Sequence, residues 1–191
     1  MDGLDSLDRA RSEFERRLRA VETEQWSFDT PRAGWTVRDV VNHVLGGNHM
    51  AVALLAGASR DEARAVRGVD ALGDDPIAAF VPSADELAAS FAAPGARDRI
   101  CHHGVGDIPG EQLLGFRTAD YALHGWDVAR AIGGDEQLDD ALVEELWLVM
   151  SPMAPMIGGS GQFGTGPSGD LDADAPLQAR LLDLSGRRPA P

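Results

Sequence analysis

The residues best suited to chemistry are Asp120 and His124, which lie four positions apart in a stretch with helical periodicity. Side chains at i and i+4 project from neighbouring turns on one face of a helix, so a carboxylate oxygen and an imidazole nitrogen can reach one ion. The same spacing also suits an Asp–His hydrogen bond inside a protein core. The pair therefore indicates either half of a metal site or a buried polar contact.

His43 is the candidate third ligand. It lies between Val40 and Val44, at the edge of the apolar arc of another expected helix. A histidine there is either a satisfied core residue or a ligand delivered from a facing helix. In the second case it forms, with Asp120 and His124, a site of two histidines and one carboxylate that leaves positions open for water or substrate. Zinc suits this set, with nickel, iron and manganese as alternatives, and Gly46 and Gly47 should leave room beside the ion.

A polar stripe on the expected helix 110–132 supports an internal site. At about 100° per residue, six positions fall within one arc of roughly 80°: Leu113, Arg117, Asp120, His124, Asp127 and Ala131. The rest of this helix is largely apolar, which is typical of a buried helix, and buried charges need partners. Arg117 is a candidate to bind an anionic substrate or to pair with an aspartate, and Asp127 is a candidate general base.

Four other residues have weaker claims. His49 lies six residues after His43, on a different face of the helix, so the two should not share an ion. His102 and His103 are either surface residues or accessory contacts to a ligand. Cys101, the only cysteine, has no neighbour in the sequence that would activate it.

These candidates require several helices to bring them together. The pattern predicts an all-α protein, an up-and-down four-helix bundle with short additional helices and a loop-rich C-terminal tail. We expect residues 1–156 to form the metal-binding bundle, and residues 157–191 to form a loop and a short helix packed on it. The expected helices are 4–26, 36–55, 83–91, 110–132 and 138–153, with an extended piece at 99–105 and a loop at 157–174.

Two capping boxes should begin helices. The first is Thr36 to Asp39, with aspartate where glutamate or glutamine is usual, and it precedes the helix that carries His43. The second is Ser83 to Glu86. Gly133 should end the long helix that carries the aspartate and histidine pair.

Charge and composition limit the function classes. The formal net charge is −14, which disfavours binding to nucleic acid or to anionic lipid. A single cysteine excludes a thiolate cluster and an intrachain disulfide. The N-terminal residues lack the apolar core of a signal peptide, and we expect a cytoplasmic protein with a small-molecule substrate.

Two long segments resemble a known family. Gly34–Val44 reads GWTVRDVVNHV, and Asp120–Gly133 reads DYALHGWDVARAIG. Both are similar to motifs of the DinB-like superfamily, in its actinobacterial branch related to the N-terminal domain of mycothiol-dependent maleylpyruvate isomerase. The stretch Pro176–Pro189 is similar to that branch's usual tail.

The resemblance implies a four-helix bundle in which His43, Asp120 and His124 bind one divalent metal. In the isomerase the acidic ligand is a glutamate, and here it is an aspartate with a shorter reach. The implied function is that of a metal-dependent transferase or isomerase, with mycothiol or another small thiol as cosubstrate. Two alternatives stay open: metal-activated water chemistry without a thiol, and metal or ligand binding without turnover. A homodimer is also left open.

Overall fold

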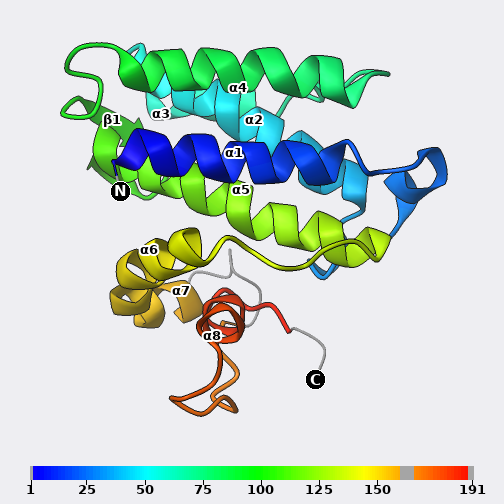
Figure 1. The fold of residues 1–191 in the computed structure, drawn as a ribbon. Helices are drawn as coiled ribbons and strands as arrows, with labels where there is room; N and C mark the ends of the chain where they lie inside the picture. The colour runs from blue at the N-terminus through cyan, green and yellow to red at the C-terminus, as the bar shows by residue number, and fades with distance from the viewer. Residues whose placement is uncertain (1, 160–165, 189–191) are drawn as a thin grey trace.

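The computed structural model describes residues 2–159 and 166–188. Four long helices lie side by side and form a bundle (Figure 1). The chain is thus an all-α four-helix bundle with short additional helices, as the sequence predicted. The bundle helices are α1 (Gly3–Leu18), α2 (Val37–Leu55), α4 (Pro76–Ala92) and α5 (Gly110–Ile132).

Shorter elements connect and extend the bundle. A two-stranded antiparallel hairpin precedes α5 and pairs Cys101 with Ile108 and His102 with Asp107. Of the expected loop at 157–174, residues 160–165 lie outside the described part. The shorter elements are η1 (Thr23–Ser27), α3 (Arg60–Arg67), β1 (Ile100–His103), β2 (Gly106–Pro109), α6 (Asp140–Met150), η2 (Ser151–Met153), α7 (Ala154–Gly159) and α8 (Leu177–Leu184).

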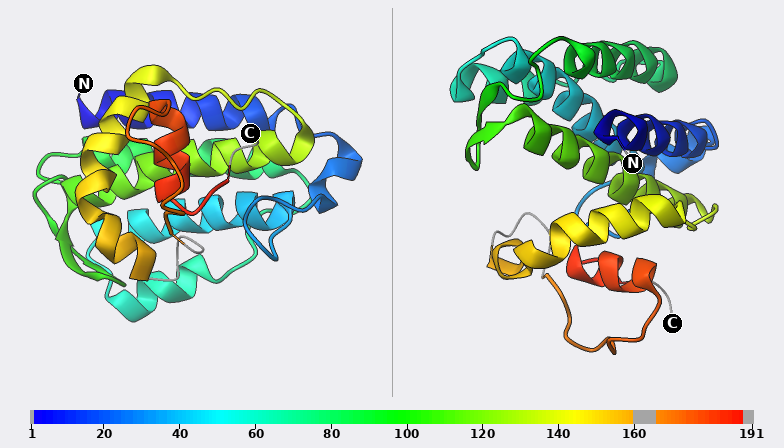
Figure 2. Two further views of the ribbon diagram at one scale, coloured as in Figure 1. Left: turned by 90° about the horizontal axis from the view of Figure 1, so that it is seen from below. Right: turned by 60° about the vertical axis from the view of Figure 1, so that its left-hand side comes forward.

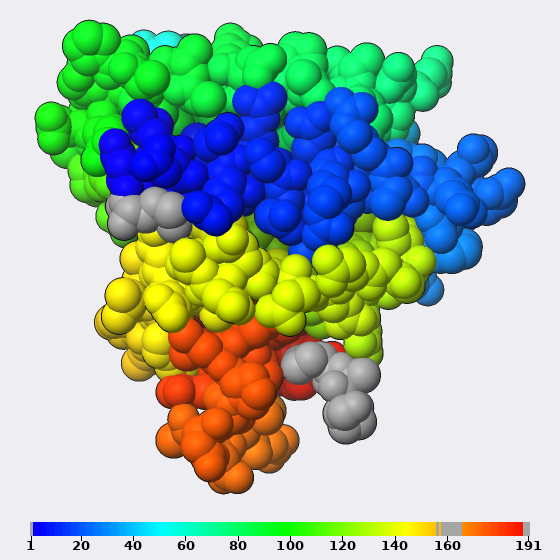
Figure 3. Space-filling view, viewed as in Figure 1, coloured from blue at the N-terminus to red at the C-terminus, as the bar shows by residue number. Residues whose placement is uncertain are grey.

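Two apolar clusters lie on different sides of α5. The larger one fills the bundle and includes Phe14, Phe80 and Tyr121, each at most 1% exposed. The smaller one joins Trp126 of α5 to side chains from α6, α7 and α8, including Leu181. The C-terminal helices therefore form a layer against α5, visible below the bundle in the right-hand view of Figure 2 and as the yellow-to-red lobe in Figure 3.

The helix that carries His43 begins at the predicted capping box. The Thr36 hydroxyl accepts a hydrogen bond from the Asp39 backbone, and the Asp39 side chain accepts one from the Thr36 backbone at 2.9 Å. This reciprocal pairing satisfies two backbone groups that a helix start leaves without partners.

The prediction that a second capping box, Ser83 to Glu86, begins a helix is wrong. Helix α4 begins earlier, at Pro76, because Asp75 accepts a hydrogen bond from the Ala78 backbone and proline suits a first helical position. Ser83 lies inside the helix, where its hydroxyl donates to the Phe80 carbonyl and accepts from Asn48.

Helix α3 is not among the helices expected from the sequence, which left the polar stretch between residues 55 and 83 without one. Helix α3 begins at a capping box in which the Ser59 hydroxyl accepts from the Glu62 backbone and the Glu62 side chain accepts from the Ser59 backbone. The short helix matters because its last residue, Arg67, points to His43.

No helix within the described ranges has both the length and the apolar character needed to cross a membrane.

Candidate metal centre

The structure brings His43, Asp120 and His124 together. His43 comes from α2, and the other two come from consecutive turns of α5. One ligand atom from each lies within 4.8 Å of the others, and His43 Nε2 lies 3.9 Å from Asp120 Oδ2. His124 is 3% exposed, while the other two are partly exposed.

This donor set fits a divalent transition metal. Ligand atoms about 2.1 Å from a zinc ion lie at most about 4.2 Å apart, so a small inward shift of the side chains would close the site. Two imidazoles and a carboxylate are a usual zinc set, and three protein ligands leave a position for water or substrate.

Asp120 is held by Arg117, one helical turn earlier. Arg117 Nη1 donates to Asp120 Oδ2 at 2.5 Å, while Nη2 donates to the Val44 carbonyl at 3.0 Å and to Asn48 Oδ1 at 2.9 Å. Burial alone would raise the pKa of Asp120, but Arg117 and the nearby histidines and arginine hold it well below its usual range. Asp120 is therefore a carboxylate at neutral pH.

The two glycines of α2 have a different use from the one expected. A Cβ at Gly47 would collide with the Arg117 guanidinium, and a Cβ at Gly46 would lie 2.7 Å from the Arg67 carbonyl oxygen. Their missing side chains thus make room for the arginine that holds Asp120 and for the end of α3.

His124 is oriented by a buried carboxylate. Its Nδ1 lies 2.8 Å from Asp127 Oδ2, and Asp127 in turn accepts from Arg187 Nε at 2.8 Å and Nη2 at 2.6 Å. Burial alone would raise the pKa of Asp127, but Arg187 and His124 lower it to about 2. An ionised Asp127 favours a proton on Nδ1, which leaves Nε2 of His124 to face a metal.

His43 contacts Arg67. Arg67 Nη2 lies 3.0 Å from Nε2 and 3.3 Å from Nδ1 of the His43 ring. Burial is the largest cause of the lowered pKa of His43, which falls to about 3, and Asp120 opposes the shift only in part. The His43 ring is therefore neutral at pH 7, as a metal ligand must be.

One aromatic ring, that of Trp35, lies beside both histidines. The Trp35 ring lies 4.8 Å from the His43 ring and 6.2 Å from the His124 ring, between centroids, and the Arg32 guanidinium carbon lies 4.0 Å from the centroid of the Trp35 ring. Trp35, which belongs to the segment Gly34–Val44, thus borders the site.

The three candidate ligands line a cavity of about 170 Å³, together with Arg32, Arg67, Leu123 and Arg187. Three arginines and one aspartate give this cavity a positive character. A larger cavity of about 310 Å³ adjoins it and shares Arg67, Asp120 and Leu123 with it.

The remaining candidates lie elsewhere. His102 is exposed and pairs across the hairpin with Asp107, Nδ1 to Oδ1 at 2.9 Å. Cys101 is fully buried, and burial raises the pKa of its thiol, so it is a poor nucleophile. His103 lines the larger cavity beside Phe116, and burial lowers its pKa.

Comparison with known proteins identifies the family of this chain. The model of the mycothiol maleylpyruvate isomerase N-terminal domain matches residues 7–129. Two uncharacterized proteins, from the CDC 1551 and H37Rv strains of Mycobacterium tuberculosis, are each 32% identical over 163 residues, covering 85% of this chain and 85% of each relative.

Solved structures agree with this assignment. The crystal structure of the mycothiol-dependent maleylpyruvate isomerase aligns with a TM-score of 0.58 at 14% identity, covering 84% of this chain and 73% of that one. A histidine-to-alanine mutant of the isomerase gives a TM-score of 0.59 at 15% identity, with 82% and 68% covered. These likenesses show a shared DinB-like fold. The chain belongs to the family of the mycothiol maleylpyruvate isomerase N-terminal domain.

Proposed function

We propose that this protein is a metal-dependent enzyme that uses a small thiol such as mycothiol to transfer a thiol group to a small molecule or to isomerise it. The proposal rests on the convergence of His43, Asp120 and His124 beside a cavity. Membership of a family named after a mycothiol-dependent isomerase supports the choice of thiol. Zinc is the metal that best suits the donor set, and nickel, iron and manganese are alternatives.

The three ligands would hold the metal and leave coordination positions open. A bound metal would lower the pKa of a thiol and so supply a thiolate nucleophile at neutral pH. The neutral ring of His43 and the ionised Asp120 are already in the protonation states that metal binding needs.

Asp127 has a positioning role in this proposal. The sequence made it a candidate general base, but both its oxygens bind other side chains, and it is fully buried outside the cavity lining. It would hold His124 in the tautomer that offers Nε2, as carboxylates behind ligand histidines commonly do.

Arg117 also acts through another residue. Three of its hydrogen bonds go to Asp120, Val44 and Asn48, so it fixes the direction of the carboxylate. The anionic part of a substrate would instead meet the arginines that line the smaller cavity, Arg32, Arg67 and Arg187.

Thermal unfolding of the zinc-loaded protein tests the thiol. We expect mycothiol to raise the melting temperature in a concentration-dependent way, because a ligand that binds only the folded state stabilises it. The S-methyl derivative of mycothiol, which cannot form a thiolate, should have a much smaller effect. Equal effects of the two compounds, or no effect of either, would remove the thiol from the proposal.

Water activation by the metal is a second candidate. His103 favours it, since this neutral histidine lines the same cavity as Asp120 and could accept a proton from a water molecule. Turnover of an ester or similar substrate without added thiol, lost in His103→Gln, would support this candidate. A protein that binds metal but turns over nothing with or without thiol would be a binding protein.

A further inference from the structure

The larger cavity is largely apolar and also has charged residues in its lining. Its volume of about 310 Å³ is within the range of sites that hold small molecules. It lies between α5 and the hairpin on one side and α6, η2 and α7 on the other. Most of its walls are apolar side chains, among them Met50, Ile108, Phe116, Leu146, Met150 and Ile157.

The charged residues that line the larger cavity are Arg67, Arg117 and Asp120, of which the last two pair with each other. Arg67 is half-buried and lines both cavities. Its nearest polar partners are His43, at 3.0 Å, and the Met50 sulfur, at 4.0 Å. Within the part of the chain that the structure describes, no carboxylate oxygen lies within 4.0 Å of the Arg67 nitrogens. Asp120, which lines the same two cavities, is paired with Arg117 instead.

A partly buried cation without an anionic partner is costly. Arginine binds carboxylates in a planar, two-point geometry. Because Arg67 lines a largely apolar cavity, the cavity suits a ligand with one carboxylate and a long apolar body.

We propose that the protein binds a monocarboxylate with a medium-length hydrocarbon body, the carboxylate on Arg67 and the hydrocarbon in the larger cavity. The carboxylate end would then lie beside Asp120 and Leu123, which border both cavities. The role of this ligand as a substrate depends on the proposed function, but its binding does not.

Isothermal titration calorimetry with octanoate tests the proposal, on both metal-free and zinc-loaded protein. We expect saturable one-to-one binding to both forms. Affinity should rise about fourfold per methylene from hexanoate to octanoate, as each buried methylene adds to the transfer free energy. Octanol, without the charge, and succinate, without the apolar body, should each bind at least tenfold more weakly.

Two variants locate the ligand. Gly115→Leu should fill the larger cavity, because Gly115 lines it and a Cβ there meets no atom within 4 Å. We expect it to weaken octanoate binding at least tenfold while the melting temperature is kept. Arg67→Gln should weaken octanoate binding at least tenfold and leave octanol binding unchanged.

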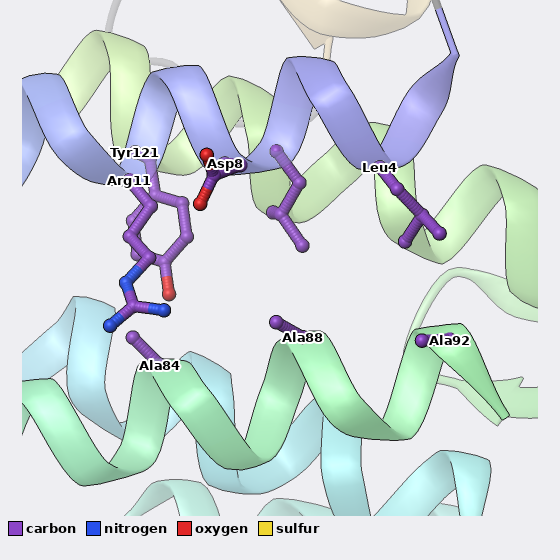
Figure 4. Close-up of a pocket in the computed structure, with 8 residues that line it drawn as sticks. Leu4, Asp8, Arg11, Ala84, Ala88, Ala92 and Tyr121 are labelled. Carbon is purple, nitrogen blue, oxygen red and sulfur yellow. The ribbon is translucent and has the colours of Figure 1, made fainter.

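Each variant has a matched control. Ala88→Leu places the same side chain in a separate cavity of about 190 Å³ between α1 and α4 (Figure 4), and should leave octanoate binding unchanged. Arg64→Gln removes an exposed charge from the same helix as Arg67. It should also bind octanoate normally.

The outcomes separate this proposal from the proposed function. Absence of octanoate binding to both protein forms, or binding that Gly115→Leu and Arg67→Gln leave unchanged, overturns the proposal. Octanoate binding by a protein that takes up no zinc would support the ligand site and contradict the metal-dependent function.

Discussion

Arg187 and Asp127 lie 60 residues apart in the sequence and form a two-point ion pair in the interior, with distances of 2.8 and 2.6 Å. Asp127 in turn holds His124. The pair thus ties the segment after α8 to a candidate metal ligand on α5. The C-terminal layer is in this way connected directly to the centre.

Removing this ion pair should weaken metal binding. We expect Arg187→Gln and Asp127→Asn each to lower zinc affinity about 10- to 100-fold, the usual effect of losing the partner of a ligand histidine. Competition with a chromophoric chelator measures the affinity. Arg188→Gln is the control, because Arg188 is the next residue and pairs with Asp183 of α8. Equal zinc affinity in Arg187→Gln and Arg188→Gln would contradict the positioning role.

Gly47 should tolerate no side chain. In Gly47→Ala the new Cβ collides with the Arg117 guanidinium, which is buried and bound to three groups. We expect a loss of about 1–3 kcal/mol in the free energy of unfolding, measured by urea denaturation. Gly115→Ala, also in a helix, meets no atom and should gain up to about 1 kcal/mol. A stable Gly47→Ala protein would show that Arg117 is not confined by this glycine.

The metal-free protein should lose stability in mild acid partly through His43. Its pKa is about 3 in the folded protein and near 6.5 in the unfolded chain. Below pH 6.5 the unfolded chain therefore binds a proton that the folded protein does not. This difference costs up to about 1.4 kcal/mol of stability per pH unit as the pH falls towards 3, and nothing above pH 6.5.

Urea denaturation at pH 7.5, 6.0 and 5.0, with a chelator present, measures this dependence. We expect the free energy of unfolding of His43→Gln to fall less between pH 6.0 and 5.0 than that of the wild type. His49→Gln, on the same helix, serves as the control. The same pH slope in the wild type and in His43→Gln would mean that the His43 ring titrates alike in both states.

Arg67 should oppose metal binding. Its guanidinium lies 3.0 Å from His43 Nε2, so a divalent cation on this ring would meet a second positive charge. We expect Arg67→Gln to bind zinc several-fold more tightly, since the repulsion falls when the charge is removed. The matched change Arg64→Gln should have no effect. Weaker zinc binding in Arg67→Gln would instead indicate that Arg67 supports the site.

The local parts of this site were predictable from the sequence. The i, i+4 spacing of Asp120 and His124 and the capping box at Thr36 depend on neighbours in one helix, which helical periodicity describes well. The fold class followed from the same periodicity. The start of α4 at Pro76 is also local, but it was missed because Ser83 and Glu86 imitate a capping box inside the helix.

The arginines around the centre were largely missed. Arg67 is at the end of a short polar helix that resembles a loop in sequence, and its direction depends on how α3 packs on α2. Arg187 follows a short helix in the tail and reaches Asp127 across the interior. Such contacts come from tertiary packing, and no local pattern encodes them.

The most direct test of the centre is a zinc titration of the wild type, His43→Ala and His49→Ala, with bound zinc measured by elemental analysis after gel filtration. Since His43, Asp120 and His124 converge to within 4.8 Å, we expect one zinc per chain in the wild type and in His49→Ala, and loss of most of it in His43→Ala. Zinc binding in His43→Ala equal to that of the wild type, or no zinc in the wild type, would contradict a metal site at these three residues.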